Sequence, residues 1–415
     1  MRVRTAVVIS VLAVLLGSGC TGRGATPEPS ASATPARTLV IWADAAQAGV
    51  LVPYAIEYGR EHGLAVDVLA IGEDRQGRFL AEVASASGRA PDVVLGNSDW
   101  IGNLVRGDAI EPVPLSGDQR AAFPEIAMRA VTLGGQVYGV PYTVESVALI
   151  RNTDLTPVPP VTIEEAAAIG RQLKEAGKVA QPVGYPVGEA GDFRSVYPLY
   201  SSAGGTIFGV KDGGEHNTAE LTVSNPESVE AFTRIAALGE KGAGALAPSV
   251  TPASALALFA NGDTAYLVAG SEAIAEVKRA GIRYEVSAVP GFATGRPPRP
   301  LVGAAAAFVA RKGPNRAMAQ DFVTTTFTRA DVAAALHRAQ PRPPALVAGV
   351  EAIRSADPDA QKFLDVAKGG VALPAVPQMG PVWDTLGRAE AAVLAGADVP
   401  ATVYDAAATI RTALR

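Results

Sequence analysis

Short apolar segments alternate with amphipathic stretches along most of the chain. The segments 38–42, 64–71, 92–95 and 147–151 are short and apolar, which is typical of strands in a covered sheet. Stretches in which apolar residues recur at helical spacing lie between them. Strands that alternate with helices in this way predict an α/β protein whose sheets are covered by helices on both faces.

One helix is predicted from its start and stop signals as well as from its pattern. Thr162 and Glu165 have the spacing of a capping box, in which each side chain accepts a hydrogen bond from the other residue's backbone N–H. Ile169 and Leu173 then share one face, and Gly177 is typical of a helix end.

Two later helices are predicted from similar signals. Pro226 follows Asn225, and proline is well tolerated at the first position of a helix because its missing N–H would have no partner there. Near the C-terminus, apolar residues share one helical face. They are Val403, Ala407, Ile410 and Leu414.

The N-terminus has the features of an export signal. Arg2 and Arg4 form a basic start, and residues 6–16 form an apolar run broken only by Ser10. This run is too short to span a bilayer but has the length of a signal-peptide core. We therefore predict that residues 1–19 are a signal peptide.

The only cysteine of the chain follows this run directly. Gly17, Ser18 and Gly19 precede Cys20, which resembles a bacterial lipobox in which the cysteine is lipidated. Leu16 stands one place further from the cysteine than is usual, so an ordinary signal peptide is the alternative. Residues 20–37 are rich in Thr, Pro, Ser, Ala and Gly, which predicts a flexible tether.

Composition and charge narrow the class of protein. The net charge is −5 and no basic stripe occurs, which argues against nucleic acid as a partner. The three histidines are scattered without metal-ligand spacing, and neither a Gly-x-Ser-x-Gly nor a Gly-x4-Gly-Lys motif is present. Residues 242–247 fit a dinucleotide fingerprint but follow a helix, so we interpret them as a turn. We expect no cofactor, no metal and no enzymatic activity.

Several stretches, in this order and spacing, are similar to one protein family. They are Leu-Val-Ile-Trp at 39–42, Ala-Pro-Asp-Val-Val at 90–94, Asp-Trp-Ile-Gly at 99–102, Tyr-Gly-Val-Pro-Tyr-Thr-Val-Glu at 138–145, Leu-Ile-Arg-Asn at 149–152, Phe-Ala-Asn-Gly-Asp-Thr-Ala at 259–265, and Pro-Gln-Met at 377–379 with Trp383. From residue 39 to about residue 412 the chain resembles the maltose/maltodextrin-binding proteins of bacterial ABC sugar importers, within extracellular solute-binding protein family 1.

The resemblance implies a periplasmic-binding-protein-like α/β fold with two lobes, a hinge and a ligand cleft between them. Lobe 1 would comprise 38–144 and 290–327, and lobe 2 would comprise 148–286 and 332–415. The chain would cross between the lobes near 144–147, 286–290 and 327–332. Hinge closure around ligand is a general property of periplasmic binding proteins.

Two carboxylates are the first candidates for sugar binding. A sugar presents hydroxyls at its rim and C–H patches on its ring faces, so a receptor needs acids and aromatic rings in one cleft. The resemblance places Asp99 and Glu145 where the family binds sugar hydroxyls. Asp99 is alternatively an N-cap or a surface acid. Glu145 lies in the apolar run 141–150, where an ionised group needs a wet cleft or an internal salt bridge.

Trp383 is the main aromatic candidate, because the resemblance aligns it with a stacking tryptophan of the family. Trp100 either lines the cleft or is buried behind its loop, whereas Trp42 ends the first strand and is expected in the core. Further contacts implied by the resemblance lie in the first cleft loops and in the segment 191–198. They are Asp44, Gln47, Asn97, Asp192, Phe193 and Arg194; the alternative for Arg194 is a solvated or paired side chain.

The chain departs from the family at two aromatic positions. Glu272 lies where the family has a third stacking tryptophan, and Asp384 stands where it has a tyrosine. Acid therefore replaces aromatic surface, and we hypothesise that the ligand is more polar, shorter or amine-bearing. The alternative is that both side chains point to solvent.

These observations predict an extracellular substrate-binding lipoprotein of a carbohydrate ABC transporter that captures maltose- or maltodextrin-like oligosaccharides. Its partners would be the oligosaccharide, the transmembrane permease subunits, and the membrane through the lipid anchor. We expect a monomer on the outer face of the cell membrane, or a secreted protein if the lipobox is not used. Alternatives are a receptor for another polar or amine-bearing ligand, a glycoside hydrolase that uses Asp99 and Glu145, and an adhesin or sensor ectodomain.

Overall fold

The four strands expected from the apolar segments are all present. They are β1 (Thr38–Ala43), β2 (Ala65–Ala70), β3 (Val93–Asn97) and β8 (Ala148–Asn152). The computed structural model describes residues 38–85, 88–211 and 215–415. The predicted signal peptide, Cys20 and the tether lie outside the described residues.

The largest sheet combines early strands with one late strand. Its order is β14-β13-β3-β1-β2, where β13 is Leu301–Ala310 and β14 is Val371–Ala372. β1 runs parallel to β2 and β3, whereas β13 is antiparallel to β3 and to β7 (Gly139–Glu145). All ten residues of β13 are buried, because both faces of this central strand are covered.

A smaller sheet has the order β11-β8-β12, in which both outer strands are antiparallel to β8. Its outer strands are β11 (Tyr266–Ala269) and β12 (Tyr284–Ser287). Two hairpins complete the described strands: β5 (Thr132–Leu133) with β6 (Gln136–Val137), and β9 (Phe208–Val210) with β10 (His216–Leu221). β4 (Ile110–Glu111) also pairs with β13.

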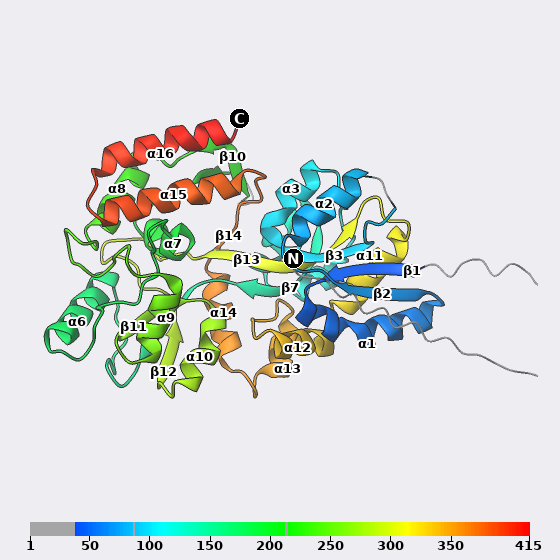
Figure 1. Cartoon of the computed structure of the whole chain (residues 1–415), viewed down its shortest axis with the longest axis horizontal. Coiled ribbons are helices and arrows are strands. Elements are labelled where there is room, and N and C mark those ends of the chain that lie inside the picture. The colour runs from blue at the N-terminus through cyan, green and yellow to red at the C-terminus, as the bar shows by residue number, and fades with distance from the viewer. Residues whose placement is uncertain (1–37, 86–87, 212–214) are drawn as a thin grey trace, which may run out of the picture. The chain divides into compact units, whose positions relative to one another are not determined.

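Helices surround both sheets (Figure 1). Those of the first half are α1 (Ala45–His62), α2 (Arg75–Ser85), α3 (Ile101–Arg106), α4 (Gly117–Ala121), α5 (Glu125–Ala130), α6 (Ile163–Glu175), α7 (Phe193–Ser202) and the short 3-10 helix η1 (Ser98–Trp100). Those of the second half are α8 (Pro226–Ala236), α9 (Pro252–Ala260), η2 (Ser271–Ala273), α10 (Ile274–Arg279), α11 (Arg316–Thr326), α12 (Ala330–Ala339), α13 (Val347–Ile353), α14 (Asp359–Lys368), α15 (Met379–Leu394) and α16 (Val399–Ala413).

The predicted capping box of α6 forms in part. The Thr162 hydroxyl accepts from the Glu165 N–H at 3.1 Å, as expected. The Glu165 carboxylate, however, accepts from the Val161 N–H at 2.7 Å, one residue before the N-cap. α8 begins with Pro226, and Val403, Ala407 and Ile410 are buried on one face of α16, as predicted.

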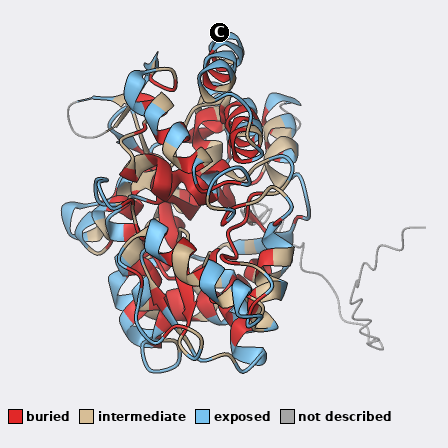
Figure 2. Ribbon diagram, turned by 90° about the vertical axis from the view of Figure 1, so that its left-hand side faces the viewer, coloured by how far each residue is buried: buried red, intermediate tan, exposed pale blue. Residues whose placement is uncertain are grey.

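Two large clusters of buried side chains form the core, and Figure 2 shows the buried residues in the interior beneath exposed helices. The first cluster packs around the large sheet, and the second lies between α7, α8, α15, α16 and the strands of the smaller sheet. Val332, Leu336 and Leu346 belong to the first cluster, whereas the resemblance implied that they are part of lobe 2. Phe327 also belongs there, so no crossing between the clusters occurs at 327–332.

Among the residues that the structure describes, no helix combines the length and apolarity that crossing a bilayer requires.

Candidate functional site

A proline-rich segment, residues 340–345, lies along the end of β7. The Val144 N–H donates to the Pro343 carbonyl at 2.9 Å, and the Ala345 N–H donates to the Tyr142 carbonyl at 3.0 Å. We call residues 340–345 the strap. The contact brings side chains that are about 200 residues apart in the chain to one place, at the point where β7 leaves the large sheet.

Glu145 ends β7 and forms an ion pair with Arg342 of the strap. Both side chains line a pocket of about 210 Å³ together with Ser146, Ser271 and Glu272. The Glu145 carboxyl therefore has both environments considered from the sequence, a salt bridge and a cleft. Burial raises its pKa above the usual value, the Arg342 guanidinium opposes this rise, and the carboxylates of Glu272 and Asp99 add to it.

The strap also meets the first loop of the large sheet. Asp44 caps α1 by accepting from the Gln47 N–H at 2.8 Å, and its other oxygen accepts from the Gln340 amide at 3.2 Å. The buried Gln47 amide donates to the Tyr142 hydroxyl at 2.8 Å. Asp44 and Gln47, both predicted from the resemblance, thus belong to a polar network beside Glu145.

A second group of predicted residues comes together between η1, α7 and α15. The Arg194 guanidinium is 3.3 Å from Asp99 Oδ2 and lies over the Trp383 ring, 5.1 Å from its centre. Asp99 Oδ1 and Trp383 Nε1 are buried and form no hydrogen bond with another described residue. Such unpaired polar atoms are costly to bury, so they are natural contacts for a polar ligand.

Close backbone contact sets the position of α7 against α15. Gly191 has a φ of +77°, and a Cβ on it would lie 1.8 Å from the Gly387 carbonyl oxygen. Asp192 caps α7 by accepting from the Ser195 hydroxyl at 2.7 Å and from the Ser195 N–H at 3.4 Å. Phe193 is only 2% exposed and stacks on Phe232 in the second core, so it has no open face for a ligand.

The remaining predicted residues occupy different environments. Trp42 is buried in the core, and Trp100 is half-buried with its ring packed closely against Gly96, where a Cβ would lie 2.1 Å from it. Asn97 is exposed at the end of β3. Glu272 faces the small pocket, where it forms no ion pair or hydrogen bond with another described residue. Asp384 is exposed on α15.

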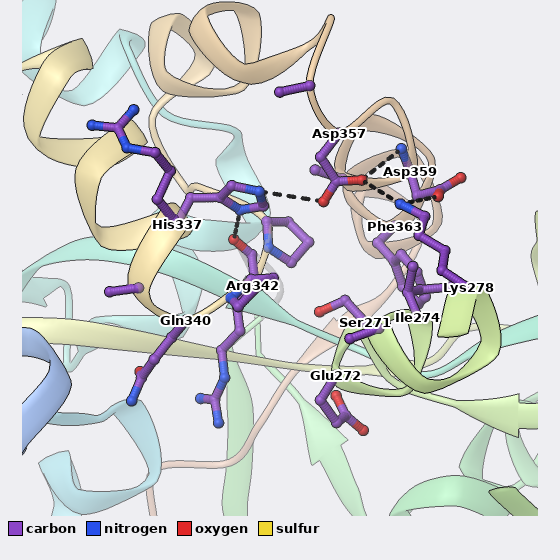
Figure 3. A pocket seen from close by; sticks show the side chains of 17 residues that line it. Ser271, Glu272, Ile274, Lys278, His337, Gln340, Arg342, Asp357, Asp359 and Phe363 are labelled. Carbon is purple, nitrogen blue, oxygen red and sulfur yellow. Dashed lines mark hydrogen bonds and ion pairs between the residues drawn. The ribbon is translucent and has the colours of Figure 1, made fainter. Parts of the chain in front are cut away.

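A larger pocket of about 550 Å³ adjoins the small one, since both are lined by Ser271, Glu272, Arg342, Pro343 and Phe363. Figure 3 shows that its wall also carries His337, Asp357, Asp359 and Lys278. Sequence reasoning did not identify the strap residues Gln340 and Arg342, because nothing in the sequence indicates that 340–345 pairs with β7. The only local signal was Pro-Arg-Pro-Pro at 341–344.

Within the described ranges, no three His, Cys, Asp or Glu side chains gather as a metal ion would require. What the site offers is carboxylates, guanidinium groups, amides and one accessible indole on an α/β framework. A concave site in which a few polar groups converge to fix orientation is typical of a protein that binds a small solute.

Comparison with known proteins identifies the class more closely. The chain belongs to the bacterial extracellular solute-binding protein family, whose model matches residues 54–362. It is 25% identical over 309 residues to the maltotriose-binding protein of Pyrococcus abyssi (strain GE5 / Orsay), across 73% of this chain and 65% of that protein. The chain thus spans slightly less than two thirds of that relative's length.

Two bacterial relatives are similarly distant. The galactooligosaccharide-binding protein of Bacillus subtilis (strain 168) is 22% identical over 68% of this chain and 67% of its own length. The maltooligosaccharide ABC transporter solute-binding lipoprotein of Streptococcus pneumoniae serotype 4 (strain ATCC BAA-334 / TIGR4) is 24% identical over 76% of this chain and 74% of its own length.

Proposed function

We propose that this protein captures an oligosaccharide of the maltodextrin type outside the cell and delivers it to the permease of an ABC importer, without chemical change to the sugar. The observation that carries the proposal is the meeting of Asp99, Arg194 and Trp383, with the Asp99 carboxylate near enough to the Glu145–Arg342 pair to act on the pKa of Glu145. The names of the relatives support an oligosaccharide, although they differ between maltooligosaccharide and galactooligosaccharide.

The chemistry of the site suits a sugar. The buried Asp99 Oδ1 can accept a hydrogen bond from a sugar hydroxyl, and a hydrogen bond to an ionised acceptor is stronger than one between neutral groups. Ser146 Oγ, also buried and without a partner among the described residues, lies in the small pocket next to Glu145. The Trp383 ring can cover the C–H face of a sugar once Arg194 moves from above it.

The size of the cleft favours more than one sugar ring. The two pockets have five lining residues in common and together extend from Glu145 to α14. In the proposed arrangement the small pocket holds one ring near Glu145, and the larger pocket accommodates the continuing chain.

We infer that the two cores belong to two lobes that close on the ligand. In this arrangement 332–350 joins lobe 1, because its buried side chains pack mainly in the first core. α14 contributes to both sides, since Leu364 packs in the first core and Phe363 packs against the smaller sheet. Asp99 and Arg194 come from elements of different cores, so their ion pair would join the lobes across the cleft.

Export and anchoring remain part of the proposal. The signal-like segment 1–19 and Cys20 favour a lipid-anchored protein on the outer face of the cell membrane. The printed name of the Streptococcus pneumoniae relative, a solute-binding lipoprotein, supports this inference.

Isothermal titration calorimetry with maltotriose tests the proposed ligand. We expect Asp99→Ala and Trp383→Ala each to weaken binding by about tenfold or more, because each removes a contact of roughly 1.5–3 kcal/mol. Asp405→Ala, which changes an exposed carboxylate on α16, is the matched control and should leave affinity unchanged. Equal affinity of all four proteins, or tighter binding of a galactooligosaccharide, would remove maltodextrin as the ligand.

A separate incubation tests for enzymatic activity. We expect maltodextrin to remain intact after long incubation with the protein, and cleavage would instead favour a glycoside hydrolase.

One observation favours a second ligand class. Glu272 is an exposed carboxylate in the small pocket that has no cationic partner among the described residues, and it lies near Glu145. An amine-bearing oligosaccharide could pair with it. The two ligand classes are distinguished by measuring the affinities of maltotriose and of a glucosamine trimer across pH. Only the amine-bearing trimer should bind more weakly to Glu272→Gln than to the wild type.

A further inference from the structure

His337, near the end of α12, connects the strap to the loop before α14. Its side chain is buried, at 7% residue exposure. Ring atom Nδ1 is 2.8 Å from the Arg342 carbonyl oxygen, and Nε2 is 3.3 Å from a carboxylate oxygen of Asp357. Figure 3 shows the ring between these two oxygens, with one interaction on each nitrogen.

Both neighbours of the ring are acceptors. A peptide carbonyl carries no proton to donate, and neither does an ionised carboxylate. A neutral imidazole has one N–H and could satisfy only one of them, whereas an imidazolium has two and satisfies both. The geometry therefore points to a doubly protonated ring.

We propose that His337, as an imidazolium, is a positioning residue that holds the strap so that Arg342 and Gln340 face the ligand cleft. This inference rests on the proposed function, since it concerns the same cleft. His337 itself need not touch the ligand.

The strap is paired with β7 from Pro343 onwards, but the backbone of Arg342 itself has few restraints. Pro341 and Pro343 flank Arg342 and have no N–H to donate, and the Arg342 N–H donates only to the Gln340 carbonyl, at 2.7 Å. The hydrogen bond from His337 thus ties the backbone of Arg342 to α12, the helix that directly precedes the strap. The Arg342 side chain then reaches Glu145.

Gln340 depends on the same geometry. Its side-chain Nε2 donates to Asp44 at 3.2 Å, and its side-chain Oε1 accepts from the Gln47 amide at 3.4 Å. Loss of the hydrogen bond from His337 would therefore loosen the partner of Glu145 and the partner of Asp44 together.

The charges around His337 favour its protonated form. Asp357 faces Nε2 and is also 3.5 Å from the Lys278 ammonium, which in turn is 3.2 Å from Asp359. Arg338, the next residue along α12, opposes protonation. Burial lowers the pKa of His337, but the hydrogen bonds to Asp357 and to the Arg342 carbonyl outweigh it, so the pKa lies above the usual value.

The sign of the pH effect follows from this direction. Because the folded protein favours the imidazolium, the restraint on the strap is complete at low pH and is lost as pH rises through the pKa of His337. Ligand affinity should therefore fall with rising pH in the range above roughly pH 6.5.

The first measurement needs no ligand. The chain has three histidines, so NMR spectra of the full chain labelled at the histidine rings should contain three sets of ring signals. The set that is lost in His337→Gln identifies His337. We expect this ring to be doubly protonated at about pH 6.5, with its pKa lowered in Asp357→Asn. A ring that is neutral at that pH would overturn the proposal.

The second measurement is maltotriose affinity from about pH 6.5 to pH 9. We expect the wild-type affinity to fall by about fivefold, as expected for one hydrogen bond, and His337→Gln to lack this fall. His62→Gln is the matched control, because His62 also lies between a carbonyl, of Tyr58, and a carboxylate, of Asp321, but on α1 away from the strap.

The outcomes separate the two proposals. A His337→Gln protein that keeps the wild-type pH dependence would show that His337 does not position the strap. If maltotriose does not bind the wild type at any pH, the proposed ligand fails, while the NMR result still decides the protonation of His337. Amide exchange of Gln340, Arg342 and Ala345, the strap residues that carry an N–H, provides the readout for the strap itself. In the wild type and in His62→Gln, exchange should quicken with pH by more than intrinsic rates explain, and in His337→Gln this extra pH dependence should be absent.

Discussion

At the scale of single residues, the proposed site depends on contacts between side chains from distant segments of the chain. Asp99, Glu145 and Trp383 follow from residue type and resemblance. Their partners, Arg194 over the Trp383 ring and Arg342 beside Glu145, depend on contacts between distant segments. An arginine on a surface helix has the same sequence signature whether it is solvated or paired.

Glu390 is a residue whose environment the sequence did not reveal. It is 0% exposed on α15, and no described side chain forms a hydrogen bond with its two carboxylate oxygens; the backbone group that acts on this carboxyl is that of Asp192. Burial raises its pKa well above the usual value, and the nearby Asp192 carboxylate adds to the rise. The raised pKa favours the protonated form of this side chain in the folded protein.

We predict that Glu390→Gln stabilises the protein at pH 8. The folded wild type binds a proton that the unfolded chain releases, so its free energy of unfolding falls as pH rises above the ordinary carboxyl pKa. Glutamine has similar shape and no charge, and should raise the free energy of unfolding at pH 8 by about 2 kcal/mol. Urea unfolding at pH 5 and pH 8 measures the difference, which should nearly vanish at pH 5. The exposed Glu240→Gln is the control, and equal effects of both substitutions would contradict the prediction.

At the scale of elements, local signals predicted what local interactions form. The strands at 38–43 and 148–152, the N-cap Thr162 and the proline start of α8 were all visible in the sequence. The strap was not, because its hydrogen bonds to β7 join residues about 200 positions apart and its three prolines show no strand period.

The junction of α7 and α15 gives a prediction at this scale. Gly191→Ala should lower the free energy of unfolding by about 3 kcal/mol, because the new Cβ meets the Gly387 carbonyl and the positive φ disfavours any side chain. Gly188 also has a positive φ, of +72°, but open space around it, so Gly188→Ala should cost only about 1 kcal/mol. Thermal and urea unfolding measure both, and equal losses would show that the close contact is unimportant.

At the scale of the whole molecule, the division of the chain into two cores carries the main prediction. Small-angle scattering should show a smaller radius of gyration with saturating maltotriose than without it, because closure of the proposed lobes would make the protein more compact. The Trp383→Ala variant should need more ligand for the same change. Binding shown by calorimetry without any change in scattering would contradict closure.

The sequence by itself determined the class of fold, the family and the main candidate acids, because apolar periodicity, turn residues and motif order are properties of neighbouring positions. Only the tertiary structure decided which of those candidates meet. It placed Asp99 beside Arg194 and Trp383, buried Phe193 in the core, and packed Val332, Leu336 and Leu346 around the first sheet. It also set His337 between two acceptors. The reason is physical: a side chain's partner and its protonation depend on groups brought close in space, and chain folding, rather than spacing along the chain, brings them there.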